Sequence, residues 1–246
     1  MAAGQRRSAV VTGAAGGMGG EIARRLCESG ARVLMVDVHE PSTVPEGAEV
    51  AQGDVADAVF LNGAVDGFAS ANNGLTDLVN AAGVLWFDRD DSLIDVDIDV
   101  WNRVLAINLT GSALAARFAV PWMKRAGGGS MVHISSIQAL RGDAKAQDAY
   151  GASKAGLLSL SKSLAIQLAG DGIRSNAILP GAIHTPMQKR WSDSSSLAEA
   201  VAGSVPLGRL GSAGDIADAA MFLLSDAASY ITGTELIVDG GVTALP

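Results

Sequence analysis

Short apolar segments recur along the chain, and stretches with the length and period of helices separate them. Strands that read as nearly continuous apolar runs are typical of a parallel sheet covered by helices on both faces. We predict strands over residues 8–11, 32–36, 76–79, 130–134, 175–179 and 235–238, with a weaker one over 48–52. Alternating strands and helices with right-handed crossovers predict an α/β fold, a Rossmann-type doubly wound parallel sheet of about seven strands.

The same pattern predicts the buried faces of the first and last helices. Ile22, Leu26 and Cys27 fall on one face of the first. Ser212 followed by Asp215 indicates where the last helix begins. The apolar face of that last helix holds Ile216, Ala219, Ala220, Leu223 and Leu224.

Length and composition fit one globular domain. The 246 residues are 48% apolar and 18% charged, which indicates a sizeable core and argues against disorder. We expect residues 1–246 to form a single catalytic domain, in which the irregular segment 185–206 is a mobile substrate lid. No apolar run approaches the roughly 20 residues of a membrane-spanning helix, and we expect only a short tail before the first strand.

Charge and cysteine content narrow the partners. A net charge of −8 without any cluster of Lys and Arg argues against nucleic acid and anionic membranes. Cys27 is the only cysteine, which excludes an internal disulfide and suits a reducing cytoplasm. His39, His133 and His184 lie far apart without metal-ligand spacing, so we expect no metal site. The partner we expect is therefore a small molecule.

A glycine-rich turn, residues 12–20, follows the first predicted strand, and we predict that a helix begins after it at about Glu21. Glycines allow the backbone to approach a pyrophosphate closely, and the N–H groups and dipole of a helix start favour negative charge. Glycines also mark ordinary turns. Because this turn joins a strand to a helix, it indicates a dinucleotide site.

Asp37 ends the second predicted strand, 18 residues after Gly19. A carboxylate there can accept hydrogen bonds from both ribose hydroxyls and repels a 2′-phosphate. The glycine turn has no Arg or Lys, and Val38 follows Asp37 where NADP would require a cation. The pattern favours NAD, although a solvated carboxylate at a strand end is the simpler alternative.

Tyr150 and Lys154 are four residues apart, on one face of a predicted helix. A nearby cation lowers the pKa of a phenol from its ordinary value near 10, so the pair suits proton transfer. The spacing alone is equally consistent with a surface pair. Ser135 and Ser136 end the fifth strand, at the edge where open α/β sheets bind ligands. One could bind a substrate oxygen and the other cap a turn.

Several separated motifs, in order, resemble the short-chain dehydrogenases/reductases, specifically their short-subunit NAD-dependent branch. The resemblance covers nearly the whole sequence. The motifs are residues 12–19, Asp54, Asn80-Ala81-Ala82-Gly83, Asn108, Ser136, Tyr150 with Lys154, Pro180-Gly181 through Thr185, and Asp239-Gly240-Gly241.

The resemblance implies an NAD(H)-dependent oxidoreductase that interconverts a secondary alcohol and a ketone. Tyr150 would exchange a proton with the substrate oxygen, while Lys154 lowers its pKa and holds the nicotinamide ribose. Ser136 would orient the substrate oxygen, and Asn108 would support a water relay toward Lys154.

The resemblance also implies a homotetramer and an NAD site. Asp54 and Val55 would contact the adenine, and residues 80–82 would contact the ribose on the adenine side. Ile183 and Thr185 would contact the carboxamide of the nicotinamide. The implied cofactor-binding set is Gly13, Gly17, Met18, Gly19, Asp37, Asp54, Val55, Asn80, Ala81, Ala82, Tyr150, Lys154, Pro180, Gly181, Ile183 and Thr185.

Three features depart from the family's pattern or stay outside it. Ala81 replaces a second asparagine, so one structural hydrogen bond is missing or replaced. The segment before Tyr150 is one residue longer than usual, which leaves Ser135 as an alternative to Ser136; we choose Ser136. The acidic stretch 88–99 is interpreted as a solvated loop and a helix start.

Two alternative functions remain, because a fold does not determine a function. The first is a non-catalytic NAD-binding sensor or scaffold. The second is an epimerase or dehydratase that retains its NAD, although that class usually adds a substrate lobe. Secondary alcohols, cyclic ketones, sugars, steroids and acyl-carrier β-ketoesters all stay open as substrates. We expect residues 138–147 and 185–206 to form the pocket wall, with Trp191 and Trp86 as apolar candidates.

Overall fold

A seven-stranded parallel sheet, in the order β3-β2-β1-β4-β5-β6-β9, forms the centre of the computed structural model, which describes residues 7–185 and 195–246. Each strand overlaps a segment predicted from its apolar run, and the doubly wound α/β fold is confirmed. The strands are β1 (Ser8–Thr12), β2 (Arg32–Asp37), β3 (Ala48–Gln52), β4 (Asp77–Asn80), β5 (Gly129–Ile134), β6 (Ile173–Pro180) and β9 (Glu235–Val238).

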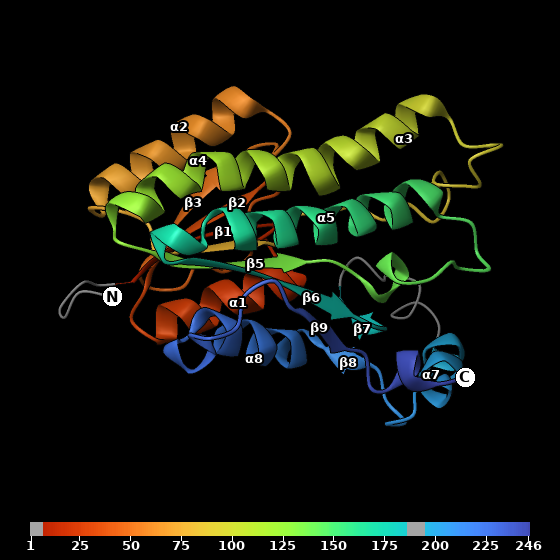
Figure 1. The fold of residues 1–246 in the computed structure, drawn as a ribbon. Helices are drawn as coiled ribbons and strands as arrows, with labels where there is room; N and C mark the ends of the chain where they lie inside the picture. Colours follow the sequence, from red (N-terminus) through yellow and green to blue (C-terminus); the bar gives the residue numbers. More distant parts are fainter. Residues whose placement is uncertain (1–6, 186–194) are drawn as a thin grey trace.

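Helices cover both faces of this sheet (Figure 1). One face carries α2 (Ala58–Ala71), α3 (Ile98–Leu105), α4 (Gly111–Arg125) and α5 (Asp148–Gln167), and the other carries α1 (Gly17–Glu28) and α8 (Ala213–Leu224). A short second sheet pairs β7 (Ile183–His184) with β8 (Gly211–Ser212), and α7 (Ser195–Ser204) lies past the ends of the main strands.

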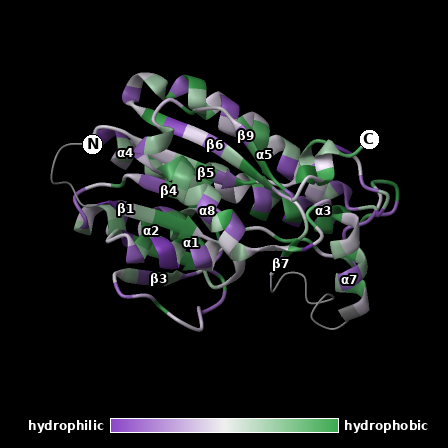
Figure 2. Cartoon of the chain, turned by 90° about the horizontal axis from the view of Figure 1, so that it is seen from below, coloured by the Kyte–Doolittle hydropathy of each residue, from purple (hydrophilic) through white to green (hydrophobic). Residues whose placement is uncertain are grey.

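Alternation of side chains along each strand divides the core into two layers. In β1, Ala9 and Val11 face α1 and α8, whereas Val10 faces α2 and α4. Hydrophobic colouring accordingly runs along the central strands in Figure 2, while the helices alternate between hydrophobic and hydrophilic residues. A sheet buried on both faces requires this composition, and therefore the apolar runs predicted the strands well.

The helix faces predicted from periodicity are largely confirmed. Ile22 and Leu26 of α1 are fully buried, and Cys27 packs against the same cluster while partly buried. In α8, Ser212 and Asp215 form the predicted capping box. The predicted face of α8 is buried, with Ala219 only partly so.

The predicted start of α1 is wrong by about one turn, because the helix begins at Gly17 and not at Glu21. Glycine is a poor helix former, so local propensity places these glycines outside the helix. Here packing overrides that propensity. A Cβ at Gly19 would overlap the carbonyl oxygen of Gly13, so only glycine lets the first helical turn lie against the end of β1.

The helical stretch Ile98–Arg125 runs from α3 to α4 through a π-helical turn, Ala106–Thr110. By length and composition alone, this 28-residue stretch could cross a membrane. In the structure it lies against the sheet and α2, with Ala115, Ala119 and Met123 fully buried. A helix that packs one face on a sheet needs this apolar content.

The predicted lid, 185–206, is only partly described. Residues 186–194, which include Trp191, lie outside the described residues, and Ser195–Ser204 form α7.

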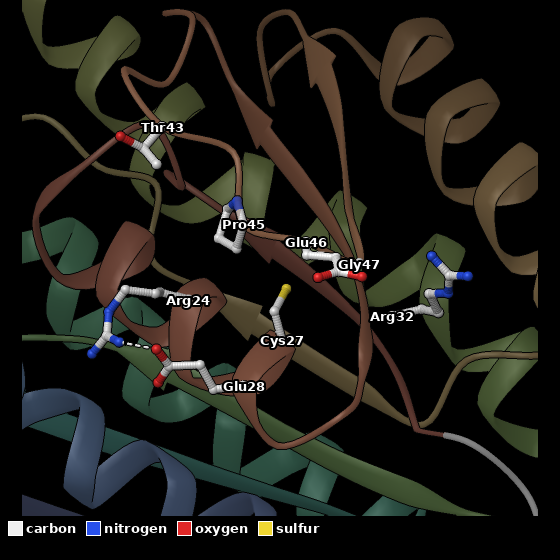
Figure 3. Close-up of a pocket in the computed structure, with 8 residues that line it drawn as sticks. All are labelled: Arg24, Cys27, Glu28, Arg32, Thr43, Pro45, Glu46 and Gly47. Carbon is white, nitrogen blue, oxygen red and sulfur yellow. Dashed lines mark hydrogen bonds and ion pairs between the residues drawn. The ribbon is translucent and has the colours of Figure 1, made fainter.

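A cavity of about 670 Å³ lies at the amino ends of the strands, at the opposite edge from the predicted site (Figure 3). Its walls carry both charges, and Arg24 pairs with Glu28 one turn further along α1 on the same wall. Burial raises the pKa of the Cys27 thiol, which disfavours the thiolate. The lining residues are Arg24, Cys27, Glu28, Arg32, Thr43, Pro45, Glu46 and Gly47.

Candidate active site

The predicted cofactor residues meet at the carboxyl edge of the sheet. Thr12 ends β1, Asp37 ends β2 and Asn80 ends β4. β1 and β4 are neighbours in the sheet although β2 and β3 separate them along the chain, so the strand order reverses between them. Open α/β sheets bind their ligands at such a switch point.

The glycine turn packs directly on the segment after β4. Gly13 has a φ of 69°, and a Cβ there would lie 2.6 Å from the backbone nitrogen of Ala82. The Thr12 hydroxyl accepts hydrogen bonds from the N–H groups of Ala81 and Ala82, both at 3.2 Å. The backbone of this segment is therefore held even though Ala81 has no amide side chain.

Asp37, at the end of β2, lies against the glycine turn. One carboxylate oxygen accepts from the Ala15 N–H at 3.0 Å, and the other accepts from the His39 N–H at 3.0 Å. Each carboxylate oxygen has two lone pairs, so both retain capacity for a further donor. Asp37 can therefore bind a ribose that lies beside the turn.

The residues at this edge fit a dinucleotide. The helix α1 begins without a side-chain cap and without an acidic residue in its first turn, so its first N–H groups remain available to a pyrophosphate. The side-chain oxygen of Asn80 is buried without a partner, whereas its amide nitrogen contacts Ser112 and His133. A glycine cradle, a bare helix start and a free acceptor are the features such a ligand requires.

The remaining predicted cofactor residues lie around the same edge. Asp54 accepts from the Ala56 N–H at 2.9 Å and pairs with Arg103. Burial raises the pKa of the Asp54 carboxyl, but these two partners together bring it below its usual value. Val55 is buried. Pro180 ends β6, Gly181 donates to Val238, and Ile183 and Thr185 are buried.

Lys154 and Tyr150 lie one turn apart on α5, with the Lys154 Nζ 5.6 Å from the centroid of the tyrosine ring. The lysine is 4% exposed, and its Nζ donates to the Ile134 carbonyl at 2.8 Å. Burial lowers the pKa of the Lys154 ammonium to about 8. The side chain thus presents a positive charge near the phenol at neutral pH.

The structure distinguishes the two serines that follow β5. Burial raises the pKa of the Tyr150 phenol, and a hydrogen bond with Ser136 acts in the opposite direction. Ser135 instead donates to the backbone carbonyl of Lys154 at 2.9 Å. Ser136 is therefore the serine beside the phenol, and Ser135 holds the helix.

Asn108 lies in the π-helical turn, fully buried. Its Nδ2 donates to the Val84 carbonyl and the Ser153 hydroxyl, both at 3.0 Å, and its Oδ1 accepts from the Val84 N–H at 2.8 Å. A Cβ at Gly83 would lie 3.3 Å from both the Asn108 Oδ1 and the Lys154 Nζ. Asn108 and Lys154 thus approach each other across Gly83.

Residues 88–99 form the expected exposed loop and helix start, where Asp97 caps α3, and Asp90 is the one buried residue among them. Asp90 is 3% exposed, and its two carboxylate oxygens accept from the N–H groups of Ala149 at 3.1 Å and Tyr150 at 2.9 Å. Gln147, which precedes α5, makes no side-chain cap. The cap of α5 therefore comes from a distant loop, and sequence reasoning missed it.

Asp90→Ala should lower the free energy of unfolding by about 1–3 kcal/mol, because two N–H groups at the buried start of α5 lose their acceptor. We also expect kcat to fall more than the KM for the cofactor rises, since the change loosens Tyr150. Thermal unfolding and steady-state kinetics measure both effects. Asp95→Ala, an exposed change in the same loop, is the control. Equal behaviour of the two variants would contradict the capping role.

Comparison with known proteins decides the family. The family model described as enoyl-(acyl carrier protein) reductase matches residues 13–243. The chain is 38% identical to the cis-4-hydroxycyclohexanecarboxylate dehydrogenase of Sinomonas cyclohexanicum, over 97% of this chain and 97% of that protein. The chain is a short-chain dehydrogenase/reductase.

Solved structures agree with this assignment. The aldohexose dehydrogenase of Thermoplasma acidophilum superimposes with a TM-score of 0.92 at 30% identity, covering 98% of this chain and 96% of that one. ElxO with NADP bound superimposes with a TM-score of 0.89 at 26% identity, covering 98% and 100%. This short-chain dehydrogenase/reductase is an oxidoreductase that uses a nicotinamide cofactor and a small-molecule substrate.

Proposed function

We propose that this short-chain dehydrogenase/reductase is an NAD(H)-dependent dehydrogenase that interconverts a secondary alcohol and a ketone. The observation that carries the proposal is the buried Lys154 ammonium, whose Nζ lies 5.6 Å from the centroid of the Tyr150 ring, with Ser136 beside the same phenol. A phenol beside a hydroxyl and a cation is equipped to exchange one proton with a substrate oxygen.

In the oxidative direction, Tyr150 as phenolate removes the hydroxyl proton while the carbinol C–H leaves as hydride and the C=O bond forms. The nicotinamide ring, when bound, supplies the hydride acceptor. Ser136 donates a hydrogen bond to the substrate oxygen and positions it at the phenol. The Lys154 ammonium would stabilise the phenolate by its positive charge and would also hold the nicotinamide ribose. Reduction follows the same steps in reverse.

The cofactor we propose is NAD. Asp37 places a carboxylate beside the glycine turn, where it would accept from ribose hydroxyls and repel a 2′-phosphate. No Arg or Lys lies in residues 12–20, and Val38 follows Asp37. The structural similarity to ElxO with NADP bound makes a direct comparison of the two cofactors necessary.

The test is absorbance at 340 nm, with secondary alcohols plus NAD or NADP and ketones plus NADH or NADPH. We expect turnover with several cyclic or acyclic secondary alcohols and faster rates with the unphosphorylated cofactor. Tight NAD binding without turnover of any substrate would instead favour the sensor function. Absence of binding of either cofactor would contradict our interpretation of the glycine turn.

A further inference from the structure

Two glutamines lie beside the catalytic pair. The Gln138 N–H donates to the Ser136 hydroxyl oxygen at 3.1 Å. Gln147 directly precedes α5, three residues before Tyr150, and its carbonyl accepts from Gly151 at 3.0 Å. The Gln138 Nε2 donates to the Gln147 Oε1 at 3.2 Å, so the two amides are linked at the start of the helix that carries Tyr150.

A carboxylate determines which way both amides point. The Asp143 carboxylate can only accept hydrogen bonds, and it accepts one from the Gln138 Nε2. That nitrogen is also the Gln138 atom that meets Gln147, so Gln147 must present its oxygen to it. These hydrogen-bond partners therefore decide which end of each amide is the nitrogen and which is the oxygen. The Nε2 of Gln147 is left pointing away from its neighbour.

The Gln147 Nε2 is a buried donor without a partner. The side chain is 6% exposed, and among the described residues only Asn80 has another buried side-chain atom in this condition. Buried polar groups are nearly always paired because an unpaired one costs free energy, so such a donor calls for a partner. A bound substrate would supply that partner.

We propose that the Gln147 Nε2 binds a second, uncharged oxygen on a ring alcohol whose reacting oxygen lies at Ser136 and Tyr150. This inference rests on the proposed function and names its substrate class. Trp86 belongs to the apolar cluster that includes Tyr150, which suits a carbon ring between the two polar positions. Three carboxylates belong to this region: Asp148 follows Gln147, Asp143 accepts from Gln138, and Asp90 accepts from the Tyr150 N–H. Because they would repel another negative charge, the acceptor we propose is a hydroxyl or carbonyl and not a carboxylate.

Two of the similar proteins are named for substrates with which this class can be compared. Cis-4-hydroxycyclohexanecarboxylate is a ring alcohol with a second oxygen-bearing group, and an aldohexose carries several hydroxyls. The first of these is anionic, so it provides a direct test of whether the second oxygen must be uncharged.

The experiment compares kcat/KM for cyclohexane-1,4-diol, cyclohexanol and cis-4-hydroxycyclohexanecarboxylate at saturating cofactor. In the wild type we expect the diol to exceed cyclohexanol, and also the carboxylate, by about tenfold or more. Gln147→Leu should bring the diol-to-cyclohexanol ratio close to one. Gln167→Leu, an exposed change at the far end of α5, should leave the ratio as in the wild type.

Asp143→Ala provides a second variant on the exposed loop, in case Gln147→Leu folds poorly. It should reduce the ratio, because the amide of Gln147 is no longer held in one orientation. A wild-type ratio near one, or a ratio that survives both variants, would overturn the inference while the dehydrogenase function stands. A higher kcat/KM for cis-4-hydroxycyclohexanecarboxylate than for the diol would overturn the inference that the second oxygen is uncharged. Turnover of other secondary alcohols but of no ring alcohol would overturn the inference that the substrate is a ring alcohol.

Discussion

Tyr150→Phe should lower kcat by about 10²–10⁴-fold, the range attributed to a positioned acid or base. The substitution removes one hydroxyl and preserves the ring that packs with Val104 and Trp86, so the fold should change little. The dissociation constant for NADH should stay within about twofold of wild type, since the glycine turn and Asp37 lie on other elements. Steady-state kinetics at 340 nm and fluorescence titration with NADH measure the two quantities.

The chain contains a matched control for this variant. Tyr230 is the only other tyrosine and is fully exposed, so Tyr230→Phe removes the same atom where no chemistry is expected. Its kcat should equal that of the wild type. If Tyr150→Phe retained half of the wild-type kcat, the phenol would not be the proton-transfer group, and the mechanism would be wrong.

Asp37→Ala should lower the preference for NAD over NADP, expressed as the ratio of kcat/KM values, by about 10–100-fold. Two effects combine. The charged acceptor of ribose hydroxyls is lost, which weakens NAD, and repulsion of a 2′-phosphate is lost, which favours NADP. Asp37 also accepts from the N–H groups of Ala15 and His39, so the affinity for both cofactors should fall somewhat as the turn loosens.

Glu49→Ala is the control for net charge, because Glu49 is an exposed carboxylate on the adjacent strand β3. It changes the formal charge by the same amount and should not alter the cofactor preference. A wild-type enzyme that already prefers NADPH, or a preference that Asp37→Ala leaves unchanged, would contradict the assignment of Asp37.

Local sequence predicted the framework because its signals act over a few residues. Each main strand was found from a short apolar run, and the Ser212–Asp215 capping box was found from its spacing. The start of α1 was misplaced where propensity and packing disagree: Gly17 and Gly19 are poor helix formers, yet close contact with Gly13 requires a glycine within the first turn.

The sequence by itself determined the parallel sheet, the glycine turn, the acidic residue at the end of β2, and the placement of Tyr150 and Lys154 on one helical face. Each depends on periodicity or on spacing within one element. Only the tertiary structure decided that Ser136 meets the phenol, that Asp90 caps α5 across about 60 positions of sequence, and that Gln147 keeps a free donor. Those outcomes depend on which distant segments pack together, and no local pattern encodes such contacts.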